Sequence, residues 1–252
     1  MSSTAIAGIA FVCMMAGAWL GALTYKYVPD LKLNRGSRDM VKLSAGMIAT
    51  MAALVLGLMI SSAYGAFDAT RLGLIQSAAN YSNLDRILDQ YGRETEPIRA
   101  ALRQNLAAKI ASFGGDDKSA VWIEAEEKST ELESIARMLR QLDPQDEEQD
   151  YLKSQALIVM SEQTALRWLL IQQSGSAMPT GFLLVLIFWF IVLFGVLSVL
   201  SPRTRTVSGV LVLCALSISG GVLLTLDMNQ PLDGIIRVSI APMENTLELL
   251  GQ

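Results

Sequence analysis

Four long apolar stretches stand out from the pattern of hydrophobic and polar positions. They run from Ala5 to Tyr25, Leu43 to Ala66, Pro179 to Leu200 and Val207 to Leu226, and none contains Asp, Glu, Lys or Arg. A helix of about 20 apolar residues crosses the roughly 30 Å hydrocarbon core of a bilayer. One charge at the centre of such a helix would cost about 3 kcal/mol. The pattern therefore predicts four transmembrane helices.

Between the second and third stretches, apolar residues recur at helical spacing. A stripe along the chain ends at Gly92, after which Thr95 is expected to cap a helix with Pro97 in its first turn. A second helix is expected from Asp117 and a third from Asp143-Pro144. The stripes comprise Leu84, Leu88 and Tyr91; Ile98, Leu102, Leu106 and Ile110; Val121, Leu132, Ile135, Leu139 and Leu142; and Leu152, Ala156, Val159, Gln163, Leu166 and Leu170. Each stripe covers one face, so these helices are expected to pack together or against another subunit.

The same patterns divide the chain into four parts. Residues 1–66 hold the first two transmembrane helices and a basic loop, and residues 67–178 form a helical extramembrane domain. Residues 179–226 hold the other two transmembrane helices, and residues 227–252 form a tail with a short amphipathic helix. We therefore expect an all-α integral membrane protein whose helical bundle is inserted between spans 2 and 3, with the second span continuing into that bundle.

Composition supports this class. The 252 residues are 52% hydrophobic and 17% charged, whereas an average soluble domain has about 25% charged residues. The net charge is −4 and no basic tail is present, so a nucleic-acid partner is not expected. Residues 1–24 contain no Lys or Arg, although a secretory signal begins with a positive region. The first stretch is therefore expected to remain as a membrane span.

Basic residues in the two short loops predict the orientation. The first loop contains Lys26, Lys32, Arg35, Arg38 and Lys42, and the loop between the last two spans contains Arg203 and Arg205. Short loops rich in Lys and Arg stay in the cytoplasm. We expect a multi-pass protein of the bacterial inner membrane, with both termini and the helical domain in the periplasm.

Catalytic chemistry is not indicated. The chain has no histidine, which removes the commonest general base and the imidazole metal ligands. Its two cysteines, Cys13 and Cys214, lie inside predicted spans. The acidic stretches at 124–133 and 143–150 lack the ligand spacing of a calcium loop and are interpreted as solvated helix faces. The sequence therefore predicts no catalytic, metal or cofactor site and no enzyme activity.

Small residues recur at every fourth position of the second stretch. This ladder consists of Ala45, Ala49, Ala53, Gly57, Ser61 and Gly65. Apolar helices gain little from the hydrophobic effect when they meet inside lipid, so small residues that permit close backbone approach mark a contact face. Two interpretations remain open: packing within one four-helix protomer, or a subunit interface or pore wall. Thr50, Ser61 and Ser62 are the candidate pore-lining hydroxyls.

Other spans offer contrasting faces. The first contains the pair Gly17 and Gly21, a GxxxG spacing that could meet the ladder. The third, which contains FLLVLIFWFIVLF, is bulky and aromatic and is expected to face lipid.

The segment after the fourth span, LDMNQPLDGIIRVSIAP, carries a recognisable motif. It resembles the tail LELDRPFxGxIRISxAP of a large family of uncharacterised bacterial membrane proteins whose domain is termed bestrophin-like. The matching positions are Pro231, Gly234, Ile236, Arg237, Ser239, Ala241 and Pro242, whereas Asn229 and Gln230 replace the usual Asp and Arg. The likeness extends over nearly the whole chain, including the basic first loop, the small-residue second span and the FWF of the third.

This resemblance implies a function class. Bestrophins are pentameric anion channels, so a homo-oligomeric ion channel in the lipid bilayer is the first expectation. A channel needs no ionisable group in its spans, because backbone, hydroxyl and hydrophobic constrictions suffice, whereas a proton-coupled transporter usually has one. The alternative is a non-catalytic scaffold or accessory subunit that binds a protein partner through its periplasmic helices.

Overall fold

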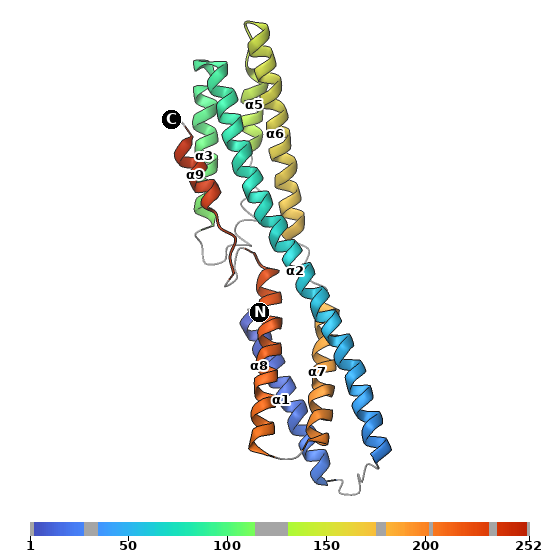
Figure 1. Cartoon of the computed structure of the whole chain (residues 1–252). Helices are drawn as coiled ribbons and strands as arrows, with labels where there is room; N and C mark the ends of the chain where they lie inside the picture. The colour runs from blue at the N-terminus through green and yellow to red at the C-terminus, as the bar shows by residue number, and fades with distance from the viewer. Residues whose placement is uncertain are drawn as a thin grey trace. The chain divides into compact units, whose positions relative to one another are not determined.

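The computed structural model describes residues 3–27, 35–113, 131–174, 180–201, 204–231 and 236–250 (Figure 1). Every regular element in these ranges is helical. The elements are α1 (Ser3–Tyr27), α2 (Arg35–Tyr91), the short 3₁₀ helix η1 (Arg93–Thr95), α3 (Glu96–Ser112), α5 (Glu131–Gln141), α6 (Glu147–Ser174), α7 (Thr180–Leu200), α8 (Arg205–Met228) and α9 (Ala241–Leu249). Helices α1, α2, α7 and α8 are long and apolar enough to cross a membrane. The all-α class and the four candidate spans are thus confirmed.

The chain divides into two compact units, and α2 contributes to both. The first, here called the span unit, comprises Met1–Gly65 and Ala177–Asn229. The second, here called the bundle unit, comprises Ala66–Ser176 and Gln230–Gln252. Since α2 is one continuous helix of 57 residues, the second span does continue into the first helix of the bundle.

In the span unit, α1 is the central element. It packs closely on both α7 and α8. Its buried face contains Ala7, Ala10, Met14 and Ala18, which recur every three or four residues as on one side of an α-helix. Small side chains on this face allow the neighbouring helices to approach closely.

The third span does not simply face lipid, and that prediction is wrong for one side of α7. Side chains along this side are buried against the other helices of the unit: Leu183, Leu186, Phe190, Leu193 and Phe194. Other bulky residues of α7, including Phe182 and Phe188, are exposed. Hydrophobicity could not separate the two sides, because every side of a membrane helix is apolar.

The bundle unit packs parts of α2, α3, α5, α6 and α9 around one hydrophobic core. The core contains Leu84, Leu88, Tyr91, Ile98, Leu102, Leu106, Leu132, Ile135, Leu139, Leu152, Ala156, Val159, Met243 and Leu250, among others. Nearly all the predicted stripe positions in the described ranges are buried here. Residues 117–130, where the second helix was expected to begin, lie outside the described ranges.

The corner between α2 and α3 is built by Gly92 and Thr95. Gly92 has a φ of 124°, a backbone conformation that glycine adopts readily because it has no Cβ. The Thr95 hydroxyl donates to the carbonyl oxygens of Leu88, at 2.6 Å, and Gly92, at 2.7 Å. Helix α3 then begins at Glu96 with Pro97 in its first turn, as the sequence predicts. Thr95 occupies the N-cap position, but its side chain makes no capping hydrogen bond to the helix.

Helix α6 begins a few residues later than the sequence predicts. It begins at Glu147 rather than at Asp143-Pro144. The carboxylate of Asp146 accepts a hydrogen bond from the Gln149 backbone N–H at 2.7 Å. Asp146 is therefore the residue that satisfies a free N–H group of the first turn, as an N-cap does.

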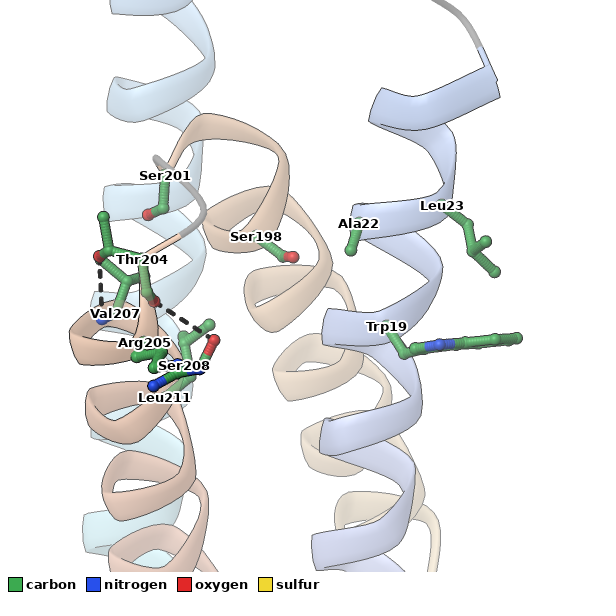
Figure 2. A pocket seen from close by; sticks show the side chains of 10 residues that line it. All are labelled: Trp19, Ala22, Leu23, Ser198, Ser201, Thr204, Arg205, Val207, Ser208 and Leu211. Carbon is green, nitrogen blue, oxygen red and sulfur yellow. Dashed lines mark hydrogen bonds between the residues drawn. The ribbon is translucent and has the colours of Figure 1, made fainter.

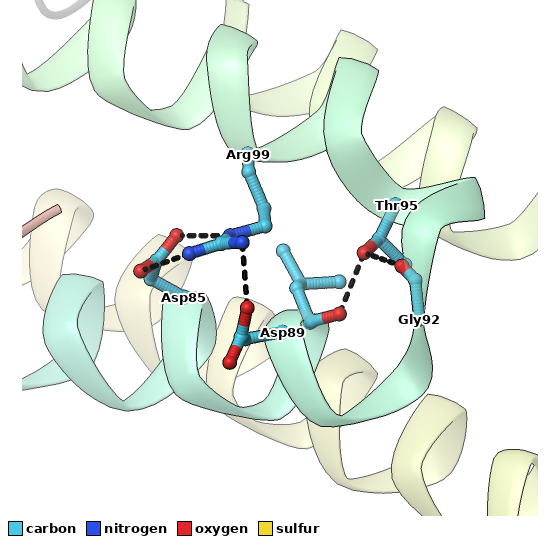
Figure 3. Close-up of polar contacts among 6 residues, drawn as sticks. Asp85, Asp89, Gly92, Thr95 and Arg99 are labelled. Atoms are coloured by element: carbon cyan, nitrogen blue, oxygen red, sulfur yellow. Dashed lines mark hydrogen bonds and ion pairs between the residues drawn. The ribbon is translucent and has the colours of Figure 1, made fainter. Parts of the chain in front are cut away.

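An ion cluster joins α2 to α3 (Figure 3). Arg99 donates through Nε and Nη2 to the two carboxylate oxygens of Asp85, at 2.8 and 3.1 Å, and through Nη1 to Asp89 at 2.7 Å. The Arg99 and Asp85 side chains are only 17% and 13% exposed, whereas Asp89 is 65% exposed. The hydrogen bonds to Asp85 raise the pKa of Arg99 above its usual value.

A second polar link joins α2 to α6 inside the bundle. The Gln163 amide donates to the Ser77 hydroxyl at 2.8 Å and accepts from the Asn80 amide at 3.3 Å. All three residues are buried. Buried polar groups that find partners stabilise one particular register of the two helices, because a shift would leave them unpaired.

The tail completes the bundle. The Val238 N–H donates to the Pro231 carbonyl at 3.0 Å, and Val238 and Met243 are buried in the core. Helix α9 lies against α3. This arrangement agrees with a tail that turns after the fourth span and ends in a short amphipathic helix.

Candidate functional site

Within the protomer, other helices bury only a small part of the surface of α2 in its membrane segment. Ala52 (0% exposed), Met59 (7%) and Ala63 (1%) are buried on one face. In the described residues of the span unit, the closest backbone packing joins α1 to α7 and α8, whereas α2 contacts its neighbours through side chains such as Leu56. One narrow face of α2 is therefore packed and the rest is uncovered.

The ladder does not follow that packed face. Each step of four residues turns about 40° around an α-helix, so the six members wind through about 200°. Ala45 lies half-buried at the edge of the packed face, whereas Ala49, Ala53, Gly57, Ser61 and Gly65 are exposed. A Cβ added at Gly57 or Gly65 would meet no atom within 4 Å. Packing within the protomer thus leaves most of the ladder uncovered.

A stripe of larger residues lies opposite the packed face. Met47, Leu54 and Leu58 are 69%, 65% and 63% exposed, and at about 100° per residue they share this side with Thr50 and Ser61. The Thr50 hydroxyl donates to the Met47 carbonyl at 2.8 Å. Because the hydroxyl hydrogen is used in this bond, Thr50 can act only as a hydrogen-bond acceptor toward the exposed side of α2. We call this set, Met47, Thr50, Leu54, Leu58 and Ser61, the outer stripe.

The first three residues of the ladder border an apolar groove inside the span unit. Ala45, Ala49 and Ala53 form one wall, and residues of α7 and α8, including Phe194 and Cys214, form the other. The groove encloses about 800 Å³. Its lining is mostly hydrocarbon, with the Cys214 thiol and the polar groups of Lys42, Ser201 and Thr206 as exceptions, so it offers mainly packing surface.

The glycine pair of α1 meets α7 rather than the ladder, so the expected pairing with α2 is wrong. A Cβ at Gly17 would lie 2.6 Å from the Ile191 carbonyl oxygen, and one at Gly21 would lie 2.2 Å from the Gly195 carbonyl oxygen. Real Cβ atoms do not approach backbone atoms so closely. The GxxxG spacing therefore brings two backbones together, as it does in other membrane helix pairs.

The tail-motif residues lie on and after the end of α8. Asn229 follows its last turn, and its N–H donates to the Thr225 carbonyl at 3.3 Å. The Ser239 hydroxyl accepts from the Ala241 N–H at 3.3 Å, next to the start of α9. Gln230 and Arg237 are each engaged in interactions, and Gly234 lies outside the described ranges. The described motif residues thus lie at the end of α8 and beside the start of α9.

One buried carboxylate escaped the sequence reasoning. Asp227, in the last turn of α8, is 3% exposed, and its neighbour Thr225 is 1% exposed. The sequence did contain a signal for it, namely an acidic residue directly after an apolar span. Burying such a carboxylate costs free energy unless it has interaction partners, and Asp227 has at least one interaction. Among the residues that the structure describes, no group of three His, Cys, Asp or Glu side chains could hold a metal ion.

Comparisons with known proteins identify the family. The bestrophin-like domain model matches residues 12–243. Two crystal structures of a bacterial bestrophin homologue from Klebsiella pneumoniae are similar in fold. The leucine-to-threonine mutant has a TM-score of 0.67 at 13% identity, covering 98% of this chain and 99% of that one. The isoleucine-to-threonine mutant has a TM-score of 0.62 at 14% identity, covering 97% and 98%.

No curated protein matched the sequence. The family model nevertheless spans most of the chain, and the fold similarity to the two structures extends over 97–98% of its length. On this evidence the chain belongs to the bestrophin-like family.

Proposed function

We propose that the protein forms a homo-oligomeric ion channel in the bacterial inner membrane, with the outer stripe of α2 along the ion pathway. One observation supports the proposal most directly: the membrane part of α2 is packed on a single narrow face and uncovered elsewhere. Membership of the bestrophin-like family adds support, since bestrophins are oligomeric anion channels.

The ladder is suited to contact between subunits. An uncovered row of small residues gains nothing from lipid, but it lets another helix approach closely. Because the row winds from the packed face to the far side, a neighbouring helix would cross α2 at an angle and follow that winding. Copies of α2 arranged in this way would turn their outer stripes toward a common axis.

The chemistry of the outer stripe fits a pore without fixed charges. Met47, Leu54 and Leu58 would form apolar constrictions, which can gate a pore by excluding water. Thr50 and Ser61 would supply hydroxyl oxygens between them. No Asp, Glu, Lys, Arg or His occurs from position 43 to 66, so conduction would depend on the width and wetting of the path.

The test is ion flux through purified protein in liposomes. Leu54→Ser should raise the flux about tenfold, since each 1.4 kcal/mol removed from a barrier is worth a factor of ten and a hydroxyl favours water in the constriction. Leu184→Ser is the matched control, because Leu184 on α7 is exposed to a similar degree, 63% against 65%. Chloride and potassium fluxes measured separately would give the selectivity.

Some outcomes would reject this channel. They are a monomeric particle in light scattering, no flux at any voltage, or an equal response to Leu54→Ser and Leu184→Ser. The scaffold alternative would then be favoured by the exposed apolar side chains of α6, namely Tyr151, Ile158, Trp168 and Leu169. Such a surface on the bundle unit is suited to a protein partner.

The proposed orientation follows from the basic loops and places the bundle unit and both termini in the periplasm. In a chain without Cys13 and Cys214, we expect an impermeant maleimide added to intact spheroplasts to label Ser154→Cys and not Ser37→Cys. Both serines are exposed on helices, so access from outside decides the result. Labelling of Ser37→Cys alone would mean that the bundle unit is cytoplasmic.

A further inference from the structure

A pocket opens at the end of the span unit where α1 and α7 finish and α8 begins (Figure 2). It encloses about 550 Å³, within the range of about 300–1,000 Å³ typical of ligand pockets. Residues of all three helices line it, among them Leu23 of α1, Ser198 of α7 and Arg205 of α8. The pocket shares no residue with the outer stripe, so the inference drawn from it does not rest on the proposed channel.

The polar groups of this pocket are suited to one kind of ligand. Arg205 is exposed, and no acidic side chain of the described ranges forms an ion pair with it. The pocket therefore presents one uncompensated positive charge. A guanidinium binds phosphate oxygens through parallel N–H groups, so the complementary ligand is a singly charged anion such as a phosphate ester.

Hydroxyl groups surround that charge. The Ser198 and Ser201 side chains are half-buried, and their hydroxyls have no hydrogen-bond partner among the described residues; in Figure 2, Ser198 points from α7 toward Ala22 of α1. The Thr204 oxygen accepts from the Val207 N–H at 3.4 Å, which leaves its own hydrogen free to donate. These hydroxyls are therefore available to donate hydrogen bonds to a phosphate oxygen.

The position of the pocket indicates the source of the phosphate. The apolar part of α1 ends at Thr24 and that of α7 at Leu200, so the pocket lies where the hydrocarbon layer meets the headgroups. Trp19, whose side chain is 65% exposed, borders the pocket, and tryptophan is enriched at this depth. Basic pockets between membrane helices bind anionic lipid headgroups.

We propose that this pocket binds the headgroup phosphate of an anionic phospholipid, with Arg205 as its charge partner and the hydroxyls of Ser198, Ser201 and Thr204 as donors. Leu23 and Leu211 on its apolar wall would lie beside the start of the acyl chains. We expect a lipid with net charge −1 to bind better than a zwitterionic one. The Arg205 guanidinium neutralises the phosphate in both, but the zwitterionic headgroup adds a positive charge that no pocket residue would pair.

The test is native mass spectrometry of the full chain in detergent, titrated with phosphatidylglycerol or with phosphatidylcholine of the same acyl chains. The wild type should bind phosphatidylglycerol about tenfold more tightly, as one charge-assisted contact allows. Arg205→Gln should abolish that preference. Arg38→Gln, which removes a basic residue near the start of α2 without touching the pocket, should retain it.

Ser201→Asp provides an independent variant if Arg205→Gln does not fold, since a carboxylate in the pocket should repel phosphatidylglycerol. An unchanged preference in either folded variant would overturn the proposal. So would complete displacement of the lipid by excess inorganic phosphate, which would mark the pocket as a site for the free anion. Neither readout depends on ion flux, so the failure of this proposal and that of the channel remain distinguishable.

Discussion

Gly21→Leu is expected to disrupt the span unit more than any other single change on α1. Its new side chain would begin 2.2 Å from the Gly195 carbonyl oxygen, so α1 and α7 must separate. Overpacking of this kind costs about 3 kcal/mol. Thermal unfolding in detergent, followed by tryptophan fluorescence, should show a midpoint lower by about 6–12 °C.

Gly8→Leu is the matched control for this change. It is the same substitution on the same helix, but a Cβ at Gly8 meets nothing within 4 Å. Leucine gains about 1 kcal/mol of helix propensity over glycine at either position, so the difference between the two variants reports the contact alone. Equal midpoints would mean that α1 and α7 do not pack through Gly21.

Arg99→Met is expected to have the largest effect in the bundle unit. It leaves the Asp85 carboxylate, only 13% exposed, without its cation. Breaking a largely buried pair by removing one partner costs about 3 kcal/mol or more, because an uncompensated charge remains. The double variant Arg99→Met with Asp85→Leu should recover much of that loss. Urea unfolding followed by circular dichroism measures each change.

Arg71→Met supplies the comparison for Arg99. Arg71 and Asp68 form a pair at 3.0 Å, but their side chains are 51% and 32% exposed. Exposed pairs contribute about 0–1 kcal/mol. A loss at Arg99 no greater than that at Arg71 would show that the Arg99 cluster lies effectively in solvent.

Periodicity along the chain was sufficient to predict the bundle. The burial of Leu84, Leu88, Ile98 and Leu102 follows from a local pattern, since in water the apolar side of a helix must find cover. Gly92 and Pro97 marked the corner between two helices for equally local reasons, namely backbone freedom at one and a missing N–H at the other.

Pairing among the spans could not be predicted in the same way. Lipid covers an apolar face as well as protein does, so hydropathy does not show which side of α7 is buried or that Gly21 meets Gly195. The winding of the ladder, by contrast, follows from its spacing. The spacing does not identify a partner helix, and no described residue lies within 4 Å of a Cβ built at Gly57 or Gly65.

The close packing of α1 on α7 and α8 also has a consequence for biogenesis. About 150 residues separate the end of α1 from the start of α7, and at about 5–20 residues per second a ribosome needs roughly 10–30 s to make them. Throughout that interval the Gly17 and Gly21 edge lacks α7, the helix that it meets in the folded protein. The newly inserted α1 must therefore wait in lipid or beside the insertion machinery, and a chain truncated before Thr180 would never cover that edge.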